Sequence, residues 1–242
     1  MPKNRIEFSI VVPVFNEADN LIPLRDNIVD AMQCMNVPYE VILVNDGSTD
    51  RSQAVIEEIC RSDNRFRFLR FDRNHGQTAA FDAGFKASRG TVIITMDADM
   101  QTDAHDIPLM TEKLADYDAV VGFRKKRADN LIKKISSRIA NSVRNTLSGE
   151  NIRDTGCPLK AIRREALQHV KLYKGMHRFF PTLLKLEGYS VVEVPVNHYP
   201  RKYGVSKYNI WNRVFRATRD LLVVRWMKDR SLNYRIVESK DP

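Results

Sequence analysis

Residues 91–101, which read TVIITMDADMQ, decide the fold. Thr91–Met96 is a short apolar run rich in β-branched residues, and such a run predicts a buried β-strand. Asp97 and Asp99 follow it one residue apart, so both carboxylates can turn toward one hard cation, and Gln101 can supply a third oxygen. Oxygen ligands of this kind suit Mg²⁺ or Mn²⁺ bridging a diphosphate. A solvated turn is the alternative, because Asp is common where strands end.

The same alternation of short apolar runs with longer helical segments extends on both sides of this stretch. The predicted strands are 8–14, 39–44, 66–71, 91–96 and 119–122, and the predicted helices are 21–35, 52–60, 78–87 and 107–114. This order is typical of βαβ units and predicts an α/β fold with a mostly parallel central sheet covered on both faces. Ligands of such sheets bind beyond the carboxyl ends of the strands, so the residues just after each run are the candidate site residues.

The alternation stops after Arg124. The sequence then predicts a basic helical segment at 128–147, an apolar stretch at 156–162, a helix at 179–186, a strand at 189–196 and a helix at 209–228. The last helix has an apolar side with basic residues near it, which is typical of a membrane-interfacial helix, but a helix docked on the core shows the same pattern. We therefore expect a catalytic domain over residues 1–208, followed by an amphipathic basic helix and tail over residues 209–242.

The composition limits the class of protein. With 242 residues, of which 43% are hydrophobic, the chain is long enough for one sizeable α/β domain. The three cysteines lack the paired spacing of a zinc site or a disulfide framework, which favours a reducing compartment. The N-terminus lacks the layout of a cleavable signal, and no apolar run approaches the ~20 residues that span a bilayer. The net charge of +9 predicts an anionic partner: nucleic acid, acidic lipid or a phosphorylated substrate.

Polar residues also follow the first two predicted strands. Asp46–Gly47 predicts a tight turn, and Asp50 is placed to cap the helix that follows. Asp46, at the strand tip before the turn, can accept hydrogen bonds from a nucleobase or a ribose. Asn16 is a candidate cap for the first helix, and Glu17 lies where a ligand can meet it.

Three motifs in this order resemble the family 2 glycosyltransferases with the GT-A nucleotide-diphosphosugar fold: Val11–Glu17 (VVPVFNE), Asp46–Asp50 (DGSTD) and Asp97–Asp99 (DAD). The resemblance covers roughly the first half of the chain. It implies that Asp97, Asp99 and Gln101 hold Mg²⁺ or Mn²⁺. It also implies a nucleotide-sugar site formed by Pro13, Phe15, Glu17, Asp46, Asp82, Asp97 and Ala98.

Within that family the remainder is most similar to the polyprenyl-phosphate glycosyltransferases. The similarity rests on Gln101 after the acidic triplet, Val121–Arg124 (VGFR), and basic residues further along the chain. It implies an acceptor-phosphate site formed by Arg124, Ser137, Arg138, Arg201, Ser206 and Lys207, and a catalytic set of Asp99, Arg124, Arg138, Arg201 and Lys207. The chemistry agrees, because planar guanidinium groups bind a dianionic phosphate in bidentate fashion.

The expected function is therefore metal-dependent, inverting transfer of a sugar from a UDP- or GDP-sugar to a polyprenyl phosphate. A same-fold enzyme that glycosylates a glycan or protein hydroxyl, with Asp154 as general base, is a rival interpretation. A basic nucleic-acid-binding module is a rival of another class. It leaves the strand-end carboxylates unexplained, so we expect no nucleic-acid partner.

The expected place of action follows from the lipid acceptor. We expect a cytoplasmic protein bound peripherally to the cytoplasmic face of a membrane. Either the C-terminal helix or a separate membrane protein would supply the attachment.

Overall fold

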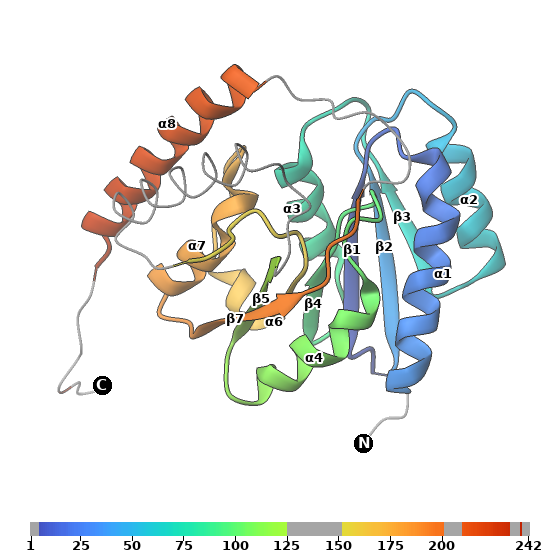
Figure 1. Ribbon diagram of the computed structural model, residues 1–242, viewed down its shortest axis with the longest axis horizontal. Coiled ribbons are helices and arrows are strands. Elements are labelled where there is room, and N and C mark those ends of the chain that lie inside the picture. Colours follow the sequence, from blue (N-terminus) through green and yellow to red (C-terminus); the bar gives the residue numbers. More distant parts are fainter. Residues whose placement is uncertain (1–4, 125–151, 201–209, 233–237, 239–242) are drawn as a thin grey trace, which may run out of the picture.

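The computed structural model describes residues 5–124, 152–200, 210–232 and 238 (Figure 1). For residues 210–218 it describes the backbone alone. Its described strands form one sheet in the order β3-β2-β1-β4-β6-β5-β7. The strands are β1 Phe8–Val14, β2 Tyr39–Asn45, β3 Phe66–Arg70, β4 Val92–Thr95, β5 Ala119–Arg124, β6 Lys160–Arg163 and β7 Val191–Val196. The helices are α1 Ala18–Met35, α2 Ser52–Ser62, α3 Gln77–Ala87, α4 Ile107–Glu112, α6 Arg164–Gln168, α7 Phe180–Leu186 and α8 Ile210–Asp229, with 3₁₀ turns η1 Ala104–Asp106, η2 Lys113–Ala115 and η3 Met176–Phe179.

Helices cover both faces of the sheet, as the largely apolar strands predict. On β1, Ile10 and Val12 face the core that α1, α2 and α4 close. Val11, between them, faces a second core, to which α3 contributes Phe81 and α7 contributes Phe180. Successive strand residues point to opposite faces, so a strand buried on both sides has to be apolar at nearly every position.

The predicted elements of the first half are confirmed with small shifts in their ends. β1 has the predicted bounds, and α1 begins at Ala18, before the predicted start at 21. The C-terminal helix α8 lies within one residue of the predicted 209–228 at each end. The predicted basic helix at 128–147 lies outside the described residues. The predicted domain boundary near 208 also falls outside them and stays a prediction.

β6 is the element that the sequence did not show as a strand. It runs antiparallel between β4 and β5, with Lys160 beside Thr95 on one side and Val121 on the other. β5 is consequently parallel to β1, β2 and β4. The sheet is mostly parallel, as expected, and the reversed strand brings its amino end to the edge where the other strands have their carboxyl ends.

Glu40 holds the opposite edge of the sheet together. Its buried carboxylate accepts hydrogen bonds from Ser9 Oγ (2.6 Å), Arg67 Nε (2.7 Å) and the backbone N–H of Arg89 (2.7 Å). Burial by itself raises the pKa of Glu40, but the hydrogen bonds and charge of its partners outweigh it, and the net pKa is lowered. This network joins β1, β2 and β3 to the end of α3.

Glu40→Gln is expected to lower the free energy of unfolding by about 1.5–3 kcal/mol at pH 7, because it removes charge-assisted hydrogen bonds. A carboxylate whose folded pKa is depressed stabilises the fold above its unfolded pKa, and this contribution is lost as the pH falls through the folded pKa. Urea unfolding of wild type and Glu40→Gln from pH 7 to pH 3 measures the difference between their free energies of unfolding. This difference should become smaller below about pH 4.3. A difference in free energy of unfolding that stays constant with pH would contradict a stabilising role for ionised Glu40.

Candidate active site at the carboxyl edge of the sheet

Most of the predicted site residues that the structure describes lie at one edge of the sheet, where four parallel strands end. Val14, Asn45, Thr95 and Arg124 are the last residues of β1, β2, β4 and β5. The antiparallel strand β6 begins at the same edge with Lys160. β1 lies between β2 and β4, so the chain order reverses beside it, and such a switch point is where open α/β sheets bind ligands.

The tips of β1 and β2 are locked to each other by side chains of the two loops. Asn16, in a left-handed conformation (φ 54°), accepts a hydrogen bond from Thr49 N (2.7 Å) with its Oδ1 and donates its own N–H to Ser48 Oγ (3.0 Å). Asp50 accepts from the first N–H of α2 (2.9 Å) and from the first N–H of α1 (3.3 Å). Asp50 thus binds the first N–H of α2, as a capping residue would, although Arg51 holds the N-cap position. Asn16 joins the two loops instead of capping α1.

Asp46 is held within a loop of the protein. Its carboxylate is 3% exposed and accepts from His75 N (2.7 Å), Gly76 N (2.9 Å) and Asn74 Nδ2 (3.0 Å). The next residue, Gly47 (φ 70°), packs so tightly that a Cβ would come within 2.2 Å of the Arg73 carbonyl carbon. These contacts tie the tip of β2 to the segment that opens α3. The nucleoside contact predicted for Asp46 stays a prediction beside this structural role.

The acidic triplet lies just after β4, and both of its carboxylates accept hydrogen bonds. Asp97 accepts from Gln77 Nε2 (2.7 Å), at the start of α3, and Asp99, 9% exposed, accepts from Gln101 N (3.2 Å). Ala98 lies between them and packs into the core. Gln101 is bonded to the segment after β7, because its backbone carbonyl oxygen accepts a hydrogen bond from Tyr199 N (2.9 Å).

The donor atoms of this triplet suit a hard cation that shares its coordination with a ligand. Within the described residues no group of three or more His, Cys, Asp or Glu side chains is placed to hold a metal ion. Asp97, Asp99 and Gln101 together offer two carboxylates and one amide oxygen. Mg²⁺ typically takes one or two protein carboxylates and completes its shell with water and phosphate oxygens. The residues therefore fit Mg²⁺ or Mn²⁺ shared with a diphosphate, and they do not fit a closed structural metal site.

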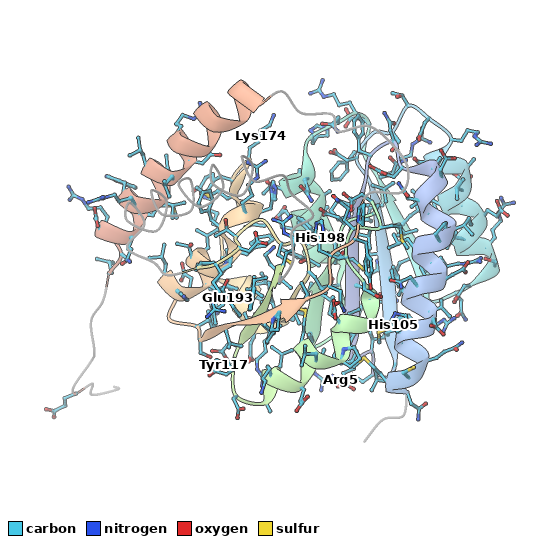
Figure 2. The ribbon with its side chains drawn as sticks, in the orientation of Figure 1. Arg5, His105, Tyr117, Lys174, Glu193 and His198 are labelled. Atoms are coloured by element: carbon cyan, nitrogen blue, oxygen red, sulfur yellow. The ribbon has the colours of Figure 1, made fainter. Side chains whose placement is uncertain are left out.

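Arg124 and Asp154 form a bidentate ion pair beside the triplet. Arg124 Nε lies 2.6 Å from Asp154 Oδ2, and its Nη2 lies 2.9 Å from Oδ1. The pair is largely buried, with the two side chains 19% and 7% exposed. Glu193, on β7 (Figure 2), accepts from the backbone N–H groups of Arg153 (2.9 Å) and Asp154 (3.3 Å) and fixes this loop. The guanidinium predicted to bind phosphate is thus held in one orientation.

This pair bears on the rival role of Asp154 as a general base. Both of its carboxylate oxygens already accept from Arg124. To take a proton from a hydroxyl group, Asp154 would have to give up a charge-assisted pair in a buried position, which is costly. The geometry therefore favours an orienting role for Asp154.

The structure places the remaining predicted residues as follows. Pro13 lies in β1 beside Val44, and Phe15 and Glu17 follow that strand at the site edge. Asp82 lies further along α3 and accepts from Lys86 Nζ (2.7 Å) on the helix surface. No contact of the described residues brings Asp82 to the acidic triplet. The predictions outside the described residues are Ser137, Arg138, Arg201, Ser206 and Lys207.

Sequence reasoning missed three polar residues at this edge. Gln77 reaches Asp97, and Lys160 is buried at the start of β6. Thr78 Oγ1 accepts from Gly175 N (3.0 Å) and lies within hydrogen-bond distance of His177 Nδ1 (2.7 Å). Burial lowers the pKa of His177 to about 3, which keeps the ring neutral. The available signal for Lys160 was a lone lysine within an apolar stretch.

Comparison with known proteins agrees with this geometry. Residues 9–171, more than half of the chain, match the model of the family described as Glycosyl transferase family 2. The chain belongs to this family. It is therefore a glycosyltransferase, as the strand-end motifs predict.

Curated relatives of this family 2 glycosyltransferase confirm the predicted subgroup. The dodecaprenyl-phosphate galacturonate synthase of Rhizobium johnstonii is 40% identical over 229 residues, which cover 92% of this chain and 68% of the relative. The undecaprenyl-phosphate 4-deoxy-4-formamido-L-arabinose transferase of Edwardsiella ictaluri is 34% identical over 204 residues, covering 84% and 63%. The family 2 glycosyltransferase described here spans about two thirds of the length of these relatives.

Solved structures confirm the GT-A fold. Glucosyl-3-phosphoglycerate synthase from Mycobacterium tuberculosis, in complex with Mn²⁺, UDP and phosphoglyceric acid, has a TM-score of 0.68 at 15% identity, covering 94% of this chain and 80% of that one. A mannosyltransferase from Pyrobaculum calidifontis, in complex with GDP-mannose and Mn²⁺, has a TM-score of 0.64 at 21% identity, covering 100% and 67%. At these identities the likeness of the glycosyltransferase to both structures concerns the fold.

The ion pair predicts a non-additive double-mutant cycle. In the wild-type background, Asp154→Asn should lower kcat/KM for sugar transfer by about tenfold to a hundredfold, because Arg124 loses its fixed orientation. In an Arg124→Met background the same substitution should change kcat/KM by less than about twofold, because the residue through which it acts is gone. Equal losses in both backgrounds would show that Asp154 acts independently of Arg124, as a general base would.

Proposed function

We propose that this enzyme transfers a sugar from a UDP- or GDP-sugar to a polyprenyl phosphate, with inversion at the anomeric carbon and with Mg²⁺ or Mn²⁺ bound. The observation that carries the proposal is that one site has an acidic end and a basic end. Asp97 and Asp99 follow β4, and Arg124, oriented by Asp154, ends β5 at the same edge of the sheet. One end offers oxygen ligands for a cation, and the other offers a guanidinium for a phosphate.

The donor lies at the first end. Asp97, Asp99 and Gln101 would hold the cation, which neutralises charge on the diphosphate when bound. The loops after β1 and β2 would enclose the nucleoside with Phe15 and Asp46. Contacts within the protein hold these loops in place, because Asn16 joins them and Asp46 anchors the start of α3. The two solved structures named above contain UDP or GDP-mannose together with Mn²⁺ on the same fold, which supports this assignment.

The acceptor lies at the second end. Both curated relatives are named for a polyprenyl-phosphate substrate or product, and one of them is 40% identical to this chain. Arg124 is the acceptor residue that the structure describes. Arg138, Arg201 and Lys207, with Ser137 and Ser206, complete the proposed phosphate site by resemblance.

The reaction is a single in-line displacement. A phosphate oxygen of the lipid forms a bond to the anomeric carbon, and the bond from that carbon to the diphosphate breaks, so the nucleoside diphosphate leaves with the electron pair. A phosphate monoester has its second pKa near about 6, so it is already ionised at neutral pH and needs no protein base. The role of the chain is to hold two anions together despite their repulsion. An Asp154 that orients Arg124 fits this chemistry.

Asp99→Asn should lower transfer by at least about a hundredfold, because it removes one carboxylate from a cation site that has two. The assay combines polyprenyl phosphate, a panel of UDP- and GDP-sugars, and Mg²⁺ or Mn²⁺. Asp118→Asn is the matched control, since Asp118 precedes β5 at the opposite edge and accepts from Ser190. Near-normal turnover of Asp99→Asn would refute the metal assignment. A wild-type enzyme that uses only hydroxyl acceptors would refute the lipid-phosphate acceptor.

Contact with a membrane surface is part of the proposal, and α8 is the element that would make it. Leu221 and Val224 on one side of α8 are buried in a cluster with Met176 and Phe179 of η3. Leu222 and Trp226, on the other side, are 54% and 63% exposed. Arg219, Arg225 and Arg230 are also exposed. Among the described residues, no helix has both the length and the apolar character needed to cross a membrane.

A helix docked by one face, with apolar and basic residues on the other, suits a bilayer interface. Trp and Leu side chains enter the headgroup region, and basic residues contribute about 1 kcal/mol each near anionic lipid. Docking on the core and contact with lipid, which the sequence left as alternatives, are thus compatible in one helix.

A Leu222→Ser, Trp226→Ser double variant should bind vesicles of phosphatidylglycerol and phosphatidylcholine roughly tenfold more weakly than wild type, because it removes apolar area from the exposed face. Vesicle sedimentation measures the partition coefficient. Phe68→Ser is the matched control, because Phe68 is 38% exposed on β3. If the α8 double variant and Phe68→Ser weakened vesicle binding equally, or if neither weakened it, α8 would not be the membrane contact.

A further inference from the structure

The segment between α6 and η3 carries an exposed aromatic and basic patch that the proposed function does not use. Lys171, Tyr173 and Lys174 are exposed, and Tyr173 is 50% exposed. Val170 and Leu172 alternate with them and are partly buried against a cluster of the interior. The segment therefore directs apolar side chains inward, and one tyrosine and two lysines toward solvent.

The packing of this segment joins it to α8, the helix proposed to contact the membrane. Leu172 packs against the cluster that holds Leu221 of α8. Gly175, in a left-handed conformation (φ 91°), lies so close to α8 that a Cβ there would come within 2.8 Å of Asp220 Oδ2. Figure 2 shows Lys174 next to the same helix. The exposed side chains of the segment and of α8 therefore form neighbouring surfaces.

The same segment reaches the carboxyl edge of the sheet. Gly175 N donates a hydrogen bond to Thr78 Oγ1 (3.0 Å), in the first turn of α3. Gln77, the residue before Thr78, donates to Asp97 of the acidic triplet (2.7 Å). The start of α3 lies at this edge, because α3 follows the parallel strand β3. Residues 171–174 therefore lie where α8 meets the edge that carries the candidate site.

We propose that residues 171–174 form a second membrane-contacting element, which docks the enzyme on an anionic bilayer together with α8 and turns the carboxyl edge of the sheet toward the lipid. The inference rests on the proposed function, because a polyprenyl phosphate has to be reached from the surface of a bilayer. A tyrosine has an apolar ring and a polar hydroxyl, which suits the headgroup region, and lysines attract anionic lipid. Lys171 Nζ lies 5.7 Å from the centre of the Tyr173 ring, so both features occur at one place.

The charge and the geometry of this surface both favour a bilayer. Residues 169–175 read HVKLYKG and contain no acidic residue. On α8, the Arg219 and Arg225 side chains are 72% and 49% exposed, whereas the Asp220 side chain, which faces the segment, is 18% exposed. A helix that touched a bilayer on its own would leave the protein free to rotate about the helix axis. A second contact away from that axis removes this freedom and fixes which edge of the sheet faces the lipid.

Vesicle sedimentation tests the proposal on the full chain with two matched triple variants. The test variant is Lys171→Gln, Tyr173→Ser, Lys174→Gln, and the control variant is Lys86→Gln, Lys113→Gln, Tyr117→Ser. Each variant loses two exposed lysines and one exposed tyrosine, so both lower the net charge equally. The control positions lie at the opposite edge of the sheet, in the last turn of α3 and just before β5, and Figure 2 shows Tyr117 far from Lys174.

On vesicles of equal parts phosphatidylglycerol and phosphatidylcholine, the test variant should bind about tenfold more weakly than wild type, because it loses two basic residues and an interfacial aromatic ring. The control variant should bind within about twofold of wild type. On phosphatidylcholine alone, a Lys171→Gln, Lys174→Gln double variant should bind as wild type does, because the lysines act through anionic lipid.

Fluorescence quenching reports the position of residue 173 directly. Trp211→Phe with Trp226→Phe removes both tryptophans of the chain and keeps an aromatic ring at each position. In that background, Tyr173→Trp should be quenched on anionic vesicles by lipids brominated near the headgroup end of their acyl chains. Tyr117→Trp should keep its fluorescence on the same vesicles.

The possible failures are distinguishable. Equal binding by the test variant and wild type, with Tyr173→Trp quenched no more than Tyr117→Trp, would overturn this inference alone and assign the patch to a protein partner or to solvent. Loss of transfer to detergent-dispersed polyprenyl phosphate in the test variant would show that the segment acts on the site itself, and would also overturn it. A wild-type chain that binds no anionic vesicles would overturn the membrane contact of the proposed function, and the inference with it.

Discussion

Compensation of buried negative charge is the constraint on which the site depends. Asp46, Asp99 and Asp154 are buried at one edge of the sheet, with Asp97 beside them. Ionised carboxylates persist in such a place only when hydrogen-bond donors or cations surround them. Backbone N–H groups before α3 donate hydrogen bonds to Asp46, Gln77 donates to Asp97, and Arg124 donates to Asp154. The loops around the site are fixed largely because they carry these donors.

The same compensation divides the edge into two chemically different halves. The acidic half, after β4, retains negative charge that a divalent cation can neutralise, and the basic half, at the end of β5, presents a guanidinium held by its carboxylate partner. β6 lies between them and contributes both Asp154, from the loop before it, and Lys160. An antiparallel strand is well suited to this place, because its amino end and preceding loop reach the edge at which parallel strands deliver their carboxyl ends. The proposed site for two anionic reactants lies where the antiparallel strand β6 is inserted between parallel strands.

The sequence predicted the fold well, and it predicted that the acidic triplet follows a strand at the carboxyl edge of the sheet; particular residues show why. The run at 8–14, apolar apart from Ser9, has the bounds of β1, because a strand buried on both faces must be apolar at nearly every position. Asp50 and the acidic triplet follow strands whose ends were visible, so their place at one edge followed from parallel topology. The sequence pattern did not predict β6 as a strand, because it has only four residues and begins with a lysine that interrupts the apolar pattern. The hydrogen bonds that Asp46 accepts from the backbone of His75 and Gly76 were not predictable, because these partners lie some thirty positions away along the chain.

The sequence by itself determined the α/β class, the parallel strands and the family motifs, since these depend on periodicity and on residues close together along the chain. Only the tertiary structure decided which charged groups meet. The partnership of Arg124 with Asp154, the anchoring of α3 by Asp46 and the burial of Lys160 between β4 and β5 arise from pairing between strands and loops distant in sequence. Periodicity reports which face of an element is buried, whereas the electrostatic partner of a buried charge depends on strand order and direction, and these are fixed when the sheet assembles.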